Sequence, residues 1–146
     1  MSYPLLVTIH LLAAIFFVGT VFFEVLVLES VSKHIPRDMM RTLERAIGTR
    51  ARRIMPWVIL VLYAAGIAMA WQHRAALAQP FNSSFGLLLS IKIILAISVF
   101  GHFVTAMVLL RKHRMTARLS ARLHWSLFCH MLGIVLLAKA MFYVHW

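Results

Sequence analysis

Hydrophobic residues along the chain form four long runs that are separated by shorter polar segments. The runs cover about residues 3–28, 54–71, 85–110 and 124–144. A helix rises about 1.5 Å per residue, so runs of this length suffice to cross roughly 30 Å of hydrocarbon. We therefore expect four transmembrane helices.

The polar segments between the runs differ in charge. Twelve of the 15 Lys and Arg residues lie in residues 29–53 and 111–123, whereas the segment between the second and third runs contains only Arg74. Basic residues are retained on the cytoplasmic side of a membrane. We therefore predict that residues 29–53 and 111–123 form cytoplasmic loops, and that both termini lie outside.

Two of the connections carry local structural signals. The first has apolar residues at a spacing that predicts a short amphipathic helix on the membrane surface: Met39, Met40, Leu43 and Ile47. In the second, residues 79–84 read Gln-Pro-Phe-Asn-Ser-Ser, which predicts a turn that also caps the third helix. The expected fold is all-α. It is a single membrane domain of residues 1–146, with four antiparallel helices in an up-and-down bundle.

The composition supports a membrane location. Hydrophobic residues make up 62% of the 146 residues and the mean hydropathy is +0.87, which exceeds what a soluble core of this size requires. A net charge of +11 would suggest a nucleic-acid partner for a soluble protein. Because the basic residues here flank apolar runs, we expect membrane lipid as partner, no nucleic acid, and a bacterial-type cytoplasmic (inner) membrane as the location.

Five ionisable side chains lie well inside the apolar runs, where they are expensive to place. They are His10, Lys92, His102, His130 and Lys139. At about 1.5 Å per residue, His10, Lys92 and Lys139 fall about 8 Å towards the outer face. His102 and His130 fall about 6 to 8 Å towards the inner face. Helical spacing places His102 on one face with Ser98, and His130 on one face with Ser126. Lys139 is expected to reach the outer interface instead.

Neutral imidazoles from two helices at one depth can act as axial ligands of a haem iron. This interpretation applies to His102 with His130, and separately to His10 with an outer partner such as Met69 or Lys92. The alternative for each histidine is an ordinary hydrogen bond between helices.

Cations near such a site have two interpretations as well. Lys92 is the candidate catalytic residue, because it can neutralise a haem propionate or position an oxidised substrate. Arg52 and Arg53 can hold propionates by bidentate pairing, or can simply set the topology.

Copper is the alternative metal, since nine Met and eight His could supply ligands for Cu(I). No Met cluster lies within a run, however, and Met in apolar helices usually fills space.

Several segments carry a resemblance to a known family. They are His10 followed by Gly19, the stretch Arg50-Ala51-Arg52-Arg53-Ile54-Met55-Pro56, Gly66 with Trp71, and Lys92 ten residues before Gly101-His102. In these features the chain resembles the HemJ protoporphyrinogen oxidases and the related CopD-type copper-resistance membrane proteins. The resemblance implies a small cytoplasmic-membrane protein that binds haem b, with His10 and Lys92 as the most important residues.

The sequence therefore predicts a haem b-binding membrane redox protein. It would transfer electrons to an acceptor such as a quinone, or act as a porphyrinogen- or quinone-linked oxidoreductase. In this hypothesis His10, His102 and His130 bind the metal. The first alternative is a CopD-like copper protein that uses His10 and Met69. The second is a non-catalytic membrane subunit whose basic loops dock a larger complex, and homo-oligomers are compatible with any of these functions.

Overall fold

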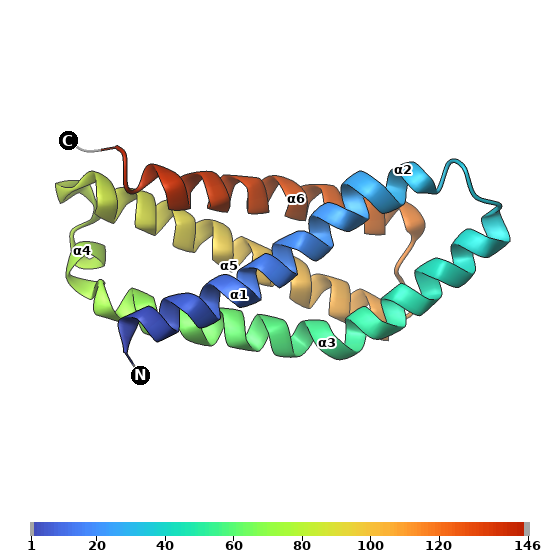
Figure 1. Cartoon of the computed structure of the whole chain (residues 1–146), viewed down its shortest axis with the longest axis horizontal. Helices are drawn as coiled ribbons and strands as arrows, with labels where there is room; N and C mark the ends of the chain where they lie inside the picture. The colour runs from blue at the N-terminus through green and yellow to red at the C-terminus, as the bar shows by residue number, and fades with distance from the viewer. Residues whose placement is uncertain (1, 145–146) are drawn as a thin grey trace. The chain divides into compact units, whose positions relative to one another are not determined.

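The computed structural model describes residues 2–144, and this part of the chain is helical without strands (Figure 1). Its elements are α1 (Tyr3–Phe22), the π-helix η1 (Phe23–Leu28), α2 (Glu29–Val31), α3 (Arg37–Gln72), α4 (Arg74–Ala78), the 3-10 helix η2 (Pro80–Asn82), α5 (Ser84–Arg111) and α6 (Ala117–Ala140). Among the described residues, four helical segments are long and apolar enough to cross a membrane: Tyr3–Val31, Arg37–Gln72, Ser84–Arg111 and Ala117–Ala140. The four predicted spans are thus confirmed as helices.

The helices form two compact units, each of which is an antiparallel hairpin. The first hairpin ends at Gln72 and packs α1 against α3, and the second begins at His73 and packs α5 against α6. Each hairpin has its own apolar contact layer, with Phe17 and Ile59 buried in the first and Val99 in the second.

The first span is continuous from α1 through η1 to the end of α2. Pro4 lies in the first turn of α1. Main-chain N–H groups there have no acceptor within the helix, so the missing N–H of proline costs no hydrogen bond. In η1 the main-chain N–H of Glu29 bonds the carbonyl of Glu24, five residues earlier. This π-helical turn widens the helix near the C-terminal end of the first span, and π-helical turns are frequent at functional sites.

The second span differs from its prediction. The separate surface helix expected within residues 29–53 does not form, because α3 begins at Arg37 and continues unbroken to Gln72. The physical reason is that residues 37–55 contain good helix formers such as Arg, Met, Leu and Glu and no proline. Pro56, inside α3, removes one helical hydrogen bond and bends the helix instead of ending it. Figure 1 shows α3 curved along its length.

The predicted turn and cap before the third span are confirmed. Ser83 lies at the N-cap of α5, and the main-chain N–H of Gly86 donates to its hydroxyl over 3.1 Å. Gly86 is needed here because a Cβ at this position would lie 2.9 Å from the carbonyl oxygen of Ala76 and 3.2 Å from that of Pro80. The loop therefore packs tightly against the start of α5.

The fourth span also has different ends from those predicted. It was expected to cover residues 124–144, but α6 begins at Ala117 and ends at Ala140. Thr116 caps the helix by accepting a hydrogen bond from the main-chain N–H of Leu119 over 3.3 Å. The cap and the following good helix formers extend α6 into the basic segment that was expected to be a loop.

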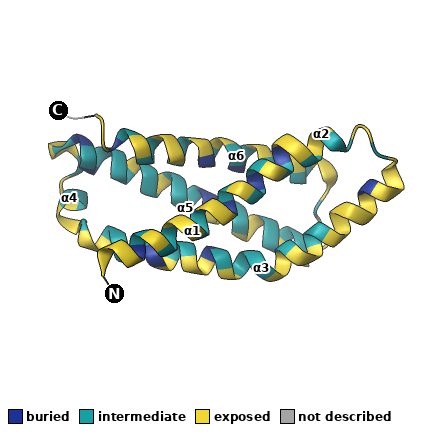
Figure 2. Cartoon of the chain, in the orientation of Figure 1, coloured by how far each residue is buried: buried dark blue, intermediate teal, exposed yellow. Residues whose placement is uncertain are grey.

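Many large apolar side chains are exposed on the helices of each hairpin, and Figure 2 shows exposed residues along all of the long helices. One example on each long helix is 62% to 67% exposed: Leu12, Ile67, Ile94 and Leu136. A water-soluble monomer rarely exposes apolar surface on this scale. Together with the four long apolar helices, these exposed side chains identify a multi-pass membrane protein.

Candidate functional site

The predicted site residues divide between the two hairpins. The first hairpin carries His10, Arg52 and Arg53, and the second carries Lys92, His102 and His130. Within the second hairpin the structure brings His102 and His130 into contact, with ring centroids 5.0 Å apart.

His10 is tied to the opposite helix of its hairpin. Its Nδ1 lies 2.9 Å from the main-chain carbonyl oxygen of Leu62 in α3. A carbonyl oxygen can only accept a hydrogen bond, so Nδ1 carries the hydrogen and donates it. In the neutral imidazole the lone pair is then on Nε2, which is the atom that binds a metal in this tautomer.

Gly66 lies one helical turn beyond Leu62, and the His10 ring packs against it. A Cβ on Gly66 would lie 3.1 Å from Cε1 of His10 and 3.4 Å from its Nδ1. Residues four apart share a helix face, so the carbonyl that orients the ring and the glycine that accommodates it belong to one face of α3. These two features fix both the tautomer and the plane of the imidazole.

The second hairpin contains the same short pattern on each of its helices. Ser98 precedes His102 by four residues in α5, and Ser126 precedes His130 by four residues in α6. Because the helices are antiparallel, each histidine lies beside the serine of the other helix. We call these four residues the serine–histidine clasp.

The hydrogen bonds of the clasp are reciprocal. Nδ1 of His102 donates to the carbonyl oxygen of Ser98 over 2.8 Å, and Nδ1 of His130 donates to that of Ser126 over 2.7 Å. In the neutral imidazole this tautomer leaves Nε2 as the acceptor. The hydroxyl of Ser126 donates to Nε2 of His102 over 2.8 Å, and that of Ser98 donates to Nε2 of His130 over 3.0 Å.

Each ring nitrogen of the clasp has one hydrogen-bond partner, and none of these partners is a charged side chain. All four acidic side chains of the protein, Glu24, Glu29, Asp38 and Glu44, precede the second hairpin in the sequence. The second hairpin therefore has no carboxylate side chain of its own to stabilise a protonated histidine.

The clasp does not fit a haem shared by its two histidines. A macrocycle between two axial imidazoles would have to separate the rings, but these rings are in contact and inclined at 56°. Their Nε2 atoms are bound to hydroxyls on opposite helices rather than directed at a common point. Across residues 2–144, no three His, Cys, Asp or Glu side chains gather closely enough to hold a metal ion.

The clasp also falls short of a hydrolytic site. A serine hydroxyl that donates to an oriented imidazole has the geometry of a nucleophile and its base. Ser98 and Ser126, however, lie in the middle of helices, where the neighbouring main-chain N–H groups are used within the helix. No main-chain donors remain there for an oxyanion, so the arrangement supports packing rather than acyl transfer.

The candidate cations have different surroundings. Lys92 is half-buried in α5, ten residues and thus about 15 Å along the axis from His102. Arg52 is exposed, and its Nη2 donates to the hydroxyl of Thr49 over 3.1 Å. Arg53 is exposed beside it in α3.

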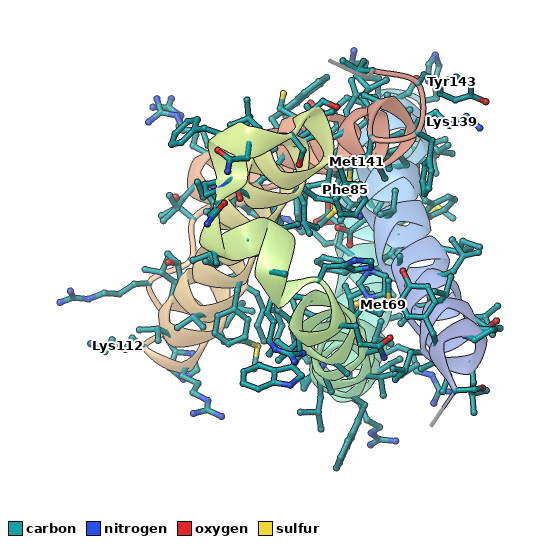
Figure 3. The ribbon with its side chains drawn as sticks, turned by 90° about the vertical axis from the view of Figure 1, so that its left-hand side faces the viewer. Met69, Phe85, Lys112, Lys139, Met141 and Tyr143 are labelled. Atoms are coloured by element: carbon teal, nitrogen blue, oxygen red, sulfur yellow. The ribbon has the colours of Figure 1, made fainter. Side chains whose placement is uncertain are left out.

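Lys139 lies in the last turn of α6 and is exposed. Its Nζ lies over the ring of Tyr143, 5.1 Å from the ring centroid. Figure 3 shows the two side chains together at this end of the helix. This cation–π contact directs the amine away from the clasp.

The sequence indicated the three histidines but not their partners. The acceptor for His10 is a main-chain carbonyl, which every residue has, so no sequence signal marks Leu62. The clasp has a partial signal, because the Ser-x-x-x-His pattern occurs on both helices of the hairpin: as Ser98–His102 in α5, and as Ser120–His124 and Ser126–His130 in α6. Comparison with protein-family models, curated proteins and solved structures finds no match to this chain.

Proposed function

We propose that this protein is a haem b-binding redox protein of the cytoplasmic membrane. In this proposal the two hairpins join as an antiparallel four-helix bundle, with both termini outside and the basic segments in the cytoplasm. The observation that carries the proposal is the orientation of His10 by the Leu62 carbonyl.

A histidine that ligates a metal almost always donates its other ring N–H to a carboxylate, a main-chain carbonyl or water. His10 has this arrangement inside an apolar helix, and Gly66 keeps the space beside the ring open. A histidine used only to join two helices would not require the ring plane to be set by a glycine as well. His10 is therefore the residue that we assign to the haem iron, which it would hold through Nε2.

Haem b supplies a one-electron redox couple when bound. The protein's own residues would bind and orient it. Lys92 inside α5 would supply positive charge for the haem propionates. Arg52 and Arg53 lie nine or more residues from Leu62 along α3, about 14 Å or more, and would instead help to set the topology. The serine–histidine clasp would hold α5 and α6 in register, and His102 and His130 would serve as ligands only if it opened.

The proposed partners are small molecules of the bilayer: a quinone as the electron acceptor, or a porphyrinogen as the molecule that is oxidised. Large apolar side chains cover the faces of the spans, so a partner dissolved in the bilayer can approach them directly. The resemblance to the HemJ family also favours this class of partner over a soluble one.

The visible spectrum of the detergent-purified protein, measured together with its metal content, tests this function. We expect a Soret band, a sharp α band on reduction and a stoichiometric amount of iron. A colourless protein with stoichiometric copper would instead support the copper-handling alternative. A colourless protein without metal, even after incubation with haemin, would leave only the non-catalytic subunit.

A further inference from the structure

Helix α3 is longer than a membrane span requires. Its 36 residues correspond to about 54 Å, whereas the hydrocarbon layer is roughly 30 Å thick. The apolar part of the helix follows Pro56, so the excess length lies at the N-terminal end, in residues 37–53. This part of α3 must lie outside the hydrocarbon.

Residues 37–53 present a continuous basic face. At about 100° per residue, four arginines fall within an arc of about 80°. They are Arg37, Arg41, Arg45 and Arg52, and we call them the basic stripe. All four are exposed. Gly48 falls in the same arc, and the Arg52 guanidinium lies beside it, 3.3 Å from where a Cβ would stand.

The charge of the basic stripe is largely unpaired. Among the described residues its one ion pair joins Arg41 to Asp38 over 3.9 Å, with side chains 74% and 98% exposed. Exposed pairs of this kind are weak. Asp38 and Glu44 flank the stripe, and residues 37–53 contain six Arg against these two acids, which leaves a net charge of +4.

The opposite side of the same helix is apolar. Met39, Leu43 and Ala46 lie about 140° to 200° from Arg41 around the helix. Met39 is 64% exposed and Leu43 is 38% exposed. If α3 projected straight into water, this face would be hydrated. A helix lying along the membrane surface would bury it, and Pro56 provides the position at which α3 can bend.

We propose that residues 37–53 lie along the inner membrane surface and that the basic stripe binds the phosphates of anionic phospholipids. Arginine pairs with phosphate through two parallel hydrogen bonds, and a basic amphipathic helix with an apolar face is typical of membrane-surface binding. An acidic protein would satisfy the arginines but would leave Met39 and Leu43 in water. The two faces together therefore favour lipid.

The test uses the full chain in nanodiscs, with a fluorophore on the apolar face. Cys129 is the protein's single cysteine, so Cys129→Ser with Leu43→Cys gives one labelling position. We expect emission at shorter wavelength, and stronger quenching by brominated acyl chains, in phosphatidylcholine with phosphatidylglycerol than in phosphatidylcholine alone. High salt should reverse most of this difference.

Three variants locate the effect. Replacement of all four basic-stripe arginines by glutamine keeps good helix formers and should abolish the dependence on anionic lipid. The control removes the same number of charges from the second hairpin: Arg111, Lys112, Arg114 and Arg118→Gln. It should behave like the parent. A stripe variant with four lysines keeps the charge and should retain the lipid dependence.

Either of two results would overturn the proposal. One is equal emission and quenching of the parent in both lipid compositions. The other is an equal loss of lipid dependence in the stripe variant and the control, because the effect would then follow total charge. A label that stays exposed to water in both lipids would direct attention to an acidic protein as the partner.

Discussion

The two hairpins use histidine in opposite ways. In the first, Nδ1 of His10 makes the bond to the other helix, through the carbonyl of Leu62. In the second, Nδ1 of each histidine bonds a carbonyl of its own helix, and Nε2 makes the bond to the other helix. The atom that joins the helices is therefore Nδ1 in one hairpin and Nε2 in the other. Residues of one type, inside equally apolar helices, differ in which nitrogen is directed at the neighbouring helix.

The largest expected effect follows from this difference. We predict that His10→Ala loses most of the bound haem, because it removes the proposed axial ligand. His102→Ala should retain haem and instead lower stability, because it leaves the hydroxyl of Ser126 without its acceptor. Haem content per protein, measured as the pyridine haemochrome, separates the two. If His102→Ala lost haem and His10→Ala kept it, the second hairpin rather than the first would provide the haem ligand, which contradicts our assignment.

The next effect concerns the packing of the His10 ring. Gly66→Ala would place a Cβ 3.1 Å from Cε1 of His10, so the ring must move and its bond to Leu62 must weaken. Changes to groups that orient a ligand lower metal affinity by roughly 10- to 100-fold, and we expect a loss of haem affinity in this range. Haemin titration of the apoprotein measures it.

Two other glycines serve as controls for this substitution. A Cβ on Gly101 would meet nothing within 4 Å, and one on Gly133 would make an ordinary contact with Leu95 at 3.4 Å. Alanine at either position should leave haem affinity unchanged. A comparable loss in all three variants would show that Gly66 acts through helix packing in general.

The smallest effect is the coupling energy within the clasp. A double-mutant cycle of Ser98→Ala and His130→Ala should give a coupling of about 0.6 kcal/mol or somewhat more, as for other hydrogen bonds between membrane helices. The matched cycle of Ser98→Ala and His102→Ala should give less. His102 bonds the main-chain carbonyl of Ser98, which alanine retains. Unfolding in mixed detergent measures both cycles, and equal couplings would contradict the assignment of the Ser98 hydroxyl to His130 and of the Ser98 carbonyl to His102.

Much of the fold could be predicted from the sequence. Four apolar runs were sufficient to predict the four long helices, and Ser83 was sufficient to predict the start of α5. Both predictions succeed because hydrophobic length and cap chemistry are local properties of the sequence. The starts of α3 and α6 were wrong. Charge was taken to mark loops, but Arg and Lys are good helix formers, and a helix continues through a basic segment unless a breaker ends it.

The site was predictable to a smaller extent. Depth and helical face indicated His102 and His130 as neighbours, and Ser98 and Ser126 were on the same faces. The sequence did not show that the serines would bind the ring nitrogens, because this depends on the register between α5 and α6. The role of Gly66 beside His10 depends in the same way on the register between α1 and α3.

The most direct test of His10 as the haem ligand is chemical rescue of His10→Ala. The variant should lose the Soret and α bands of the wild-type protein, and free imidazole added with haemin should restore them by occupying the space of the missing ring. If His10→Ala binds haem with an unchanged spectrum and no response to imidazole, His10 is not the ligand and the proposed function fails with it.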